Sequence, residues 1–315
     1  MKNVLHRIGI LLLLCAVLPV HAAQWLPKPS NISPSVWVWI GPYEAPSQAN
    51  RGYRMNLGFV VGKQAVAVID SGYSPDMATE MLSRIREITP LPVRYVINTN
   101  SQPHRFMGND VFRQAGAEII AASEAVTRME NEGIGFAATV ARTLGLKEGA
   151  IQPPQLPHRK IEKAGHLVLD LGGGTRLVVR DFGRAHTRGS LVVEVPSEQT
   201  VFAGDILYGG RLLTVLPDSH TAQWVAAYDA LRRLKAKRFV PGHGEVGALK
   251  QFEFPTYRYL VSLRAHMDKA VKAGRDSDVA IKGFDSAPWK KLANFDELAG
   301  RNASLTFLEA EAEGF

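Results

Sequence analysis

Four short polar segments, each directly after an apolar run, hold most of the side chains in this sequence that could bind a metal ion. They are Asn100–Arg105, Ala185–Thr187, Ala203–Asp205 and Pro241–Gly244. Each lies close to a glycine or proline, so a rigid strand end can direct its side chains to one place. Three of the segments offer histidine and one offers aspartate. Imidazole nitrogen and carboxylate oxygen suit zinc or iron, although an isolated histidine is more often a surface or core residue.

Two β-rich halves, each followed by helices, must position these segments. The first half contains a hairpin, Leu57–Val61 with Ala65–Ile69, and a buried strand at Val93–Asn98. The second half contains two further hairpins, at His166–Asp170 with Arg176–Asp181 and at Leu191–Val195 with Thr200–Ala203. Helical patterns follow at Pro75–Ile88, Ala222–Leu234 and Thr256–Ala273.

The order of these elements predicts an α+β fold, an αββα sandwich of two packed sheets with helices outside. No linker divides the halves, so we expect a single domain over residues 23–315, with its core at about 35–275. The segment Gly133–Lys160 has no regular pattern and is expected to lie over one face.

The composition excludes several classes of protein. The chain has 315 residues, of which 46% are hydrophobic and 21% charged, an ordinary globular balance that excludes a disordered chain. Its single cysteine excludes a disulfide framework and a cysteine-based zinc knuckle. The formal net charge is +7, but the densest basic stretch, Arg232–Arg238, ends a helical pattern and has no aromatic residues between its charges. We therefore expect no nucleic-acid partner.

The first 22 residues have the pattern of a signal peptide. Lys2 and Arg7 precede the apolar run Ile8–Leu18, which is too short to span a membrane, and cleavage is expected after Ala22 or Ala23. This pattern predicts a periplasmic or secreted protein whose mature chain has no membrane span.

The sequence resembles the metallo-β-lactamase superfamily over about residues 35–275. Asn56–Gly72 looks like its opening hairpin, and the segments around His186, Asp205 and His243 look like its later metal-ligand motifs, in the same order. In outline the chain is most similar to the periplasmic quinoprotein relay system zinc metallohydrolases. The resemblance implies a metal site at the edge of two sheets, where a metal-activated water hydrolyses an ester, thioester, amide or phosphoester. It also implies that Asp70, at a strand end, has a structural role next to the metal ligands and does not bind the metal itself.

The first ligand motif departs from the family pattern. The usual His-x-His-x-Asp-His falls on Asn100-Ser101-Gln102-Pro103-His104-Arg105, so Asn100 and Gln102 stand where two histidines belong. Amide oxygens are weak, neutral ligands for zinc. His104 replaces an aspartate that binds the second metal and orients water, and Arg105 replaces the last histidine. Some β-lactamases of the family carry asparagine or arginine at these positions, so Gln102 and His104 are the substitutions that matter most.

Two interpretations of the site follow. In the first, His104, Asp205 and His243 hold one metal ion, expected to be zinc, with His186 near the open position, and the protein hydrolyses a small-molecule substrate. In the second there is no metal, Arg105 pairs with Asp205 in place of the cation, and the protein binds a small molecule or a periplasmic partner without catalysis.

Overall fold

The computed structural model describes residues 24–314, and the expected signal peptide lies outside the described residues. In this range, seven strands form one sheet in the order β1-β2-β3-β4-β5-β6-β7. The other five form a second sheet in the order β12-β11-β10-β9-β8. The strands of the first sheet are β1 Ser30–Ser33, β2 Val36–Trp39, β3 Leu57–Val61, β4 Val66–Ile69, β5 Val93–Ile97, β6 Glu118–Ala122 and β7 Arg159–Ile161. Those of the second are β8 His166–Asp170, β9 Arg176–Asp181, β10 Leu191–Val195, β11 Thr200–Tyr208 and β12 Arg238–His243.

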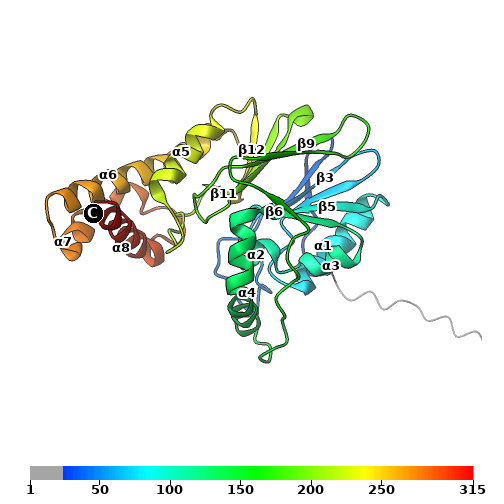
Figure 1. Cartoon of the computed structure of the whole chain (residues 1–315), viewed down its shortest axis with the longest axis horizontal. Coiled ribbons are helices and arrows are strands. Elements are labelled where there is room, and N and C mark those ends of the chain that lie inside the picture. Colours follow the sequence, from blue (N-terminus) through cyan, green and yellow to red (C-terminus); the bar gives the residue numbers. More distant parts are fainter. Residues whose placement is uncertain (1–23, 315) are drawn as a thin grey trace, which may run out of the picture.

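Helices cover the outer faces of the two sheets (Figure 1). Helices α1, α3 and α4 lie on the side of the first sheet, and α5 contacts β11 of the second. The α-helices are α1 Pro75–Ile88, α2 Pro103–Phe106, α3 Asn109–Gln114, α4 Ser123–Thr143, α5 Thr221–Leu231, α6 Tyr259–Lys272, α7 Ser277–Gly283 and α8 Phe295–Glu313. This arrangement confirms the predicted αββα sandwich.

The opening hairpin forms as its two apolar runs predict. Strands β3 and β4 pair in antiparallel register, with Phe59 opposite Val68 and Gly58 opposite Ile69. Helix α1 then begins where local chemistry favours it, because the side chain of Ser74 accepts a hydrogen bond from the amide of Met77 and Pro75 is its first residue. The turn between β4 and α1 contains Asp70, which therefore faces the end of β5.

Two expectations from the sequence were wrong. The segment Gly133–Lys160 is not irregular from its start, because α4 continues through Gly133 to Thr143. A Cβ at Gly133 would lie only 3.2 Å from the Cβ of Pro153. The glycine therefore permits close packing of the segment that follows α4. Strand β11 does not end at Ala203 but continues to Tyr208, held by parallel pairing with β12.

The last two helices, α7 and α8, lie beyond the range of the family resemblance. Helices α6, α7 and α8 lie together at one end of the molecule (Figure 1), and buried Leu298 and Phe307 of α8 join the apolar cluster that includes α5 and α6. Residue Ala293, just before α8, pairs with the segment after β11 through the bridge to Arg211. No helix within residues 24–314 is both long enough and apolar enough to cross a membrane.

Candidate metal centre

The four polar segments meet at one end of the two sheets. His104 lies on the short helix α2 after β5, Asp205 lies within β11, and His243 ends β12. One ligand atom of each of these three residues lies within 4.8 Å of those of the other two. His186, in the loop between β9 and β10, is not part of this group.

The loop that carries His104 is fixed by a pair of buried amides. Asn98 and Asn109 donate hydrogen bonds to each other's side-chain oxygen, at 3.0 and 2.8 Å. Asn98 also donates to the main-chain carbonyl of Arg105 at 2.9 Å. These bonds tie both ends of the segment together and hold α2 against the end of the sheet.

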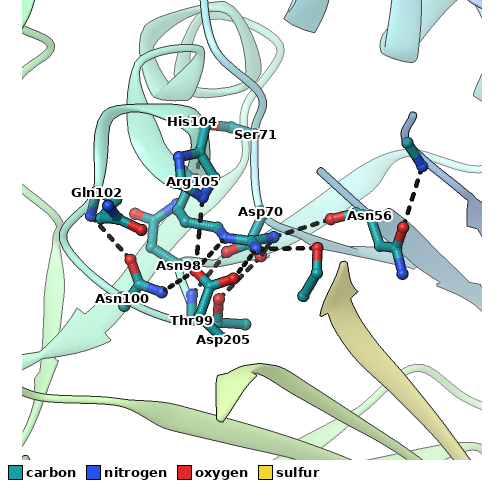
Figure 2. Close-up of polar contacts among 12 residues, drawn as sticks. Asn56, Asp70, Ser71, Asn98, Thr99, Asn100, Gln102, His104, Arg105 and Asp205 are labelled. Atoms are coloured by element: carbon teal, nitrogen blue, oxygen red, sulfur yellow. Dashed lines mark hydrogen bonds and ion pairs between the residues drawn. The ribbon is translucent and has the colours of Figure 1, made fainter. Parts of the chain in front are cut away.

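Asp205 is paired with Arg105 through both carboxylate oxygens (Figure 2). Arg105 Nη2 lies 2.6 Å from Asp205 Oδ1, and Arg105 Nε lies 3.1 Å from Asp205 Oδ2. Both side chains are 1% exposed. Burial by itself would raise the pKa of Asp205, but the guanidinium of Arg105 holds it well below its usual range. Asp205 is therefore an anion in the folded protein.

Asp70 is the second carboxylate of this cluster. Its Oδ2 accepts hydrogen bonds from Arg105 Nη1 at 3.0 Å and from the hydroxyl of Thr99 at 2.9 Å. Its Oδ1 accepts from the main-chain amide of Thr99 at 2.7 Å. Asp70 has a left-handed backbone, with φ of 62°, which turns the chain at the end of β4. Burial raises the pKa of Asp70 to about 6, although Arg105 opposes the shift. The single guanidinium thus links two buried carboxylates.

The two amides at the altered ligand positions bond to their neighbours. Asn100 Nδ2 donates to Asp205 Oδ2 at 2.7 Å, and Asn100 Oδ1 accepts from the main-chain amide of Gln102 at 2.8 Å. Gln102 Oε1 lies 2.7 Å from His186 Nε2, which donates to it. Each of these two amide oxygens therefore already accepts a hydrogen bond from a neighbouring N–H group.

The imidazoles of His104 and His243 face the carboxylate of Asp205. His243 Nδ1 donates to the carbonyl of Arg54 at 2.9 Å, so the unprotonated Nε2 lies 3.4 Å from Asp205 Oδ1. His104 Nε2 lies 3.5 Å from Asp205 Oδ2 and is buried without a hydrogen-bond partner. Burial, followed by the charge of Arg105, lowers the pKa of His104 to about 4. Burial also holds the pKa of His243 well below its ordinary value.

A cavity of about 170 Å³ opens in front of these groups. Its lining consists of Pro46, Arg54, Gln102, His104, His186, Tyr208, Arg211, Thr214 and His243. Sequence reasoning missed Arg54, Tyr208 and Arg211. None of them lies in a recognisable motif, and only their burial around one cavity distinguishes them from surface residues.

Acid should destabilise the protein between about pH 6.5 and pH 4. Burial lowers the pKa of His104 and His186 to about 4, whereas unfolded histidine titrates near 6.5. The unfolded state therefore binds more protons in this interval, and the free energy of unfolding falls as the pH falls. Asp70 opposes this trend, because its raised pKa makes the folded state bind more protons between 3.8 and about 6. The two imidazoles outweigh the one carboxyl, so denaturant titrations in EDTA should show a net loss of unfolding free energy as the pH falls. An unfolding free energy that stays constant over this interval would contradict the lowered pKa values of the two histidines.

Gly242 is required for the close approach of β12 to the Arg105–Asp205 pair. A Cβ at this position would lie 2.1 Å from Asp205 Oδ1 and 2.7 Å from Arg105 Nη2. We expect Gly242→Ala to lower the free energy of unfolding by about 1–3 kcal/mol, measured by urea denaturation. The matched control is Gly300→Ala on α8, where a Cβ meets nothing within 4 Å and a helix interior favours alanine. Equal stability of the Gly242→Ala variant and the wild type would refute this packing role.

Comparison with known proteins agrees with this geometry. The sequence model of the metallo-beta-lactamase superfamily matches residues 53–243, which include every residue of the cluster. The alpha subunit of a 2,4-dinitroanisole O-demethylase from Nocardioides sp. (strain JS1661) is 22% identical over 268 residues, covering 81% of this chain and 74% of that protein. An acyl-coenzyme A thioesterase from Gallus gallus is 23% identical over 239 residues, covering 71% of this chain and 82% of that protein.

Solved structures show the same fold. A metallo-beta-lactamase from Pontibacter korlensis superposes with a TM-score of 0.57 at 21% identity, covering 74% of this chain and 98% of its own. The mono-zinc form of a metallo-beta-lactamase from Pseudomonas aeruginosa gives a TM-score of 0.56 at 20% identity, covering 75% and 98%. At these identities the likeness extends to the fold alone.

Proposed function

This chain belongs to the metallo-β-lactamase superfamily, and from that premise we propose that it is a hydrolase that holds a single zinc ion on His104, Asp205 and His243. Two histidines and one carboxylate form a ligand set that zinc accepts in catalytic sites. When bound, such an ion lowers the pKa of a water ligand and polarises a carbonyl oxygen.

The orientation of His243 carries this proposal. Its Nδ1 proton is committed to the carbonyl of Arg54, so its Nε2 directs a lone pair toward Asp205 Oδ1 at 3.4 Å. A lone pair against a carboxylate is unfavourable unless a cation lies between them. The ligand atoms of His104, Asp205 and His243 lie within 4.8 Å of one another, with each imidazole Nε2 nearest a different oxygen of Asp205. The buried, unpartnered Nε2 of His104 is the second donor of the same kind.

The remaining residues favour one ion rather than two. Asn100 and Gln102 use their oxygens in hydrogen bonds, and His186 donates its Nε2 proton to Gln102. Of these three residues, only His186 keeps a metal-binding nitrogen without a partner among residues 24–314, its Nδ1, and one nitrogen cannot hold a second zinc by itself. Arg105 holds the carboxylate of Asp205 from the side of Asp70 and fixes its orientation toward the two imidazoles. Arg105 is thus a positioning residue in this proposal.

A second candidate function is that of a non-catalytic binding or accessory protein. The bidentate Arg105–Asp205 pair favours it, since the guanidinium already neutralises the carboxylate without any metal. In that case the cavity binds a small molecule or a partner protein, and the zinc affinity is negligible. Under either function we propose export to the periplasm or the medium with removal of residues 1–22, which N-terminal sequencing of the exported protein would test.

Zinc-dependent hydrolysis tests the favoured function. The thioesterase relative makes acyl thioesters the first substrates to assay, followed by esters and amides. We expect activity on one of these classes that EDTA removes and zinc restores, and that His104→Ala lowers by at least about 100-fold. His166→Ala is the control, because His166 lies exposed on β8 and away from the cavity. Hydrolysis that survives both EDTA and His104→Ala would refute the proposal.

A further inference from the structure

The side chain of Thr256 holds the end of β11 by two hydrogen bonds. The main-chain amide of Tyr208 donates to Thr256 Oγ1 at 3.0 Å, and Thr256 Oγ1 donates to the carbonyl of Tyr208 at 2.9 Å. A hydroxyl has one proton to donate and lone pairs to accept with, so it satisfies both main-chain groups at once. Thr256 is 0% exposed and lies in the π-helical turn η3 Glu253–Arg258, directly before α6.

The end of β11 depends on such side chains because strand pairing does not fully support it. In residues 24–314, β10 pairs with β11 over Thr200–Phe202 and no further. On the other side, the parallel pairing with β12 changes register before Tyr208. Side chains take the place of a neighbouring strand: Thr256 bonds to Tyr208, and Trp224 Nε1 donates to the carbonyl of Ile206 at 2.9 Å. Without these partners the buried main-chain groups would be left unpaired, at a cost in stability.

Tyr208 in turn fixes the place of His243, one of the three proposed zinc ligands. The two residues are register partners in the pairing of β11 with β12, and the amide of Gly209 donates to the carbonyl of His243 at 2.9 Å. The Tyr208 ring stacks on the imidazole, with 5.1 Å between the ring centres and 27° between the planes. Nδ1 of this imidazole is bonded to the carbonyl of Arg54. A displacement of the Tyr208 ring would therefore turn the imidazole about this bond and move Nε2 relative to Asp205.

We propose that Thr256 is a positioning residue of the metal site, which acts through Tyr208 to hold the imidazole of His243 in its ligand orientation. Thr256 lies beyond the segment 53–243 that matches the superfamily and is not among the residues that line the cavity. The support therefore comes from the C-terminal part of the chain. This inference rests on the proposed function for the role of zinc, but the orientation of His243 can be measured without zinc.

Replacing Thr256 by valine and by serine tests this role. Valine keeps the shape of the side chain but makes neither hydrogen bond, whereas serine keeps the hydroxyl. In Thr256→Val we expect the zinc affinity to fall by about 10–100-fold, as for other residues that support a ligand without touching the metal. In EDTA, the NMR signals of the His243 ring should shift, because the ring current of Tyr208 acts on them. Thr256→Ser should resemble the wild type in both measurements.

Thr306→Val is the matched control. Thr306 is also 0% exposed, but its hydroxyl on α8 has no hydrogen-bond partner among residues 24–314. Its replacement should leave the zinc affinity and the His243 signals unchanged and should not lower the thermal midpoint. Thr256→Ala is a second variant without the hydroxyl, and its smaller side chain avoids any clash that valine introduces.

The outcomes separate a positioning role from a purely structural one. A lower thermal midpoint in Thr256→Val and Thr256→Ala, with the His243 signals and the zinc affinity unchanged, would overturn the proposal. A Thr256→Ser variant that behaves like Thr256→Val would also overturn it, because the hydroxyl would then not be the cause. If the wild type binds no zinc while the His243 signals in EDTA still depend on the hydroxyl, the single-zinc function is refuted and the positioning of His243 by Thr256 stands.

Discussion

Replacing Arg105 by methionine should lower the free energy of unfolding by about 3–5 kcal/mol. Methionine keeps most of the side-chain volume but leaves Asp205 and Asp70 buried without a counter-ion. Arg105 also donates to the carbonyls of Asn56 and Gly242, at 2.9 and 3.2 Å, and these acceptors lose their partner as well. Urea denaturation in EDTA measures the loss without any contribution from a bound metal.

Arg176→Met is the matched control for this prediction. Arg176 pairs with Asp170 at 3.3 Å, but both side chains are more than half exposed. An exposed ion pair contributes at most about 1 kcal/mol, so the control should remain within that margin. If Arg105→Met were as stable as this control, the buried pair would not be an organising element of the site.

Replacing Asp205 by asparagine should abolish tight zinc binding. The change removes the only anionic ligand of the proposed set, and bound metal should be lost on dialysis. In EDTA the free energy of unfolding should fall by only about 1–3 kcal/mol, because Arg105 keeps its contact with Asp70 and the asparagine oxygen can still accept a hydrogen bond. Asp205→Asn should therefore destabilise the zinc-free protein less than Arg105→Met.

Two further variants make the Asp205 result decisive. Asp170→Asn, on the exposed β8, should keep its zinc and change stability by at most about 1 kcal/mol, because it removes only an exposed ion pair. Combining Arg105→Met with Asp205→Asn should destabilise the protein by about 1–3 kcal/mol less than the sum of the single changes. In the double variant neither charge of this pair is left buried without its partner. The recovery is incomplete, since Asp70 remains without its guanidinium. Unchanged zinc affinity in Asp205→Asn would refute the ligand set.

Much of this molecule could be predicted from local patterns. The β3–β4 hairpin follows from two apolar runs joined by a short turn, and helix α1 begins at Pro75 as its pattern predicts. The order of the polar segments indicated the fold. The end of β11 could not be predicted, since residues beyond Ala203 stay extended only through pairing with β12. The segment from Gly133 was likewise expected to be irregular, whereas α4 continues to Thr143 and Gly133 allows Pro153 to pack closely against it.

The candidate site, like the fold, could be predicted from the sequence only in part. The sequence predicted His104, His186, Asp205 and His243 as metal-site residues, and the structure groups three of them, without His186. The sequence left open whether Arg105 pairs with Asp205, because 100 residues separate the two. In the structure these two residues form an ion pair, and Arg105 also pairs with Asp70. Arg211 was beyond prediction because its burial depends on contacts with the segment at Ala293, more than 80 residues further along the chain.

The zinc content of the purified mature protein tests the central claim most directly. After loading with excess zinc and exhaustive dialysis at neutral pH, elemental analysis should find one zinc ion per chain. His243→Ala should hold none, and His166→Ala should hold one. A wild-type protein that stays free of metal, or one that retains two tightly bound zinc ions per chain, would contradict a single-zinc site on His104, Asp205 and His243.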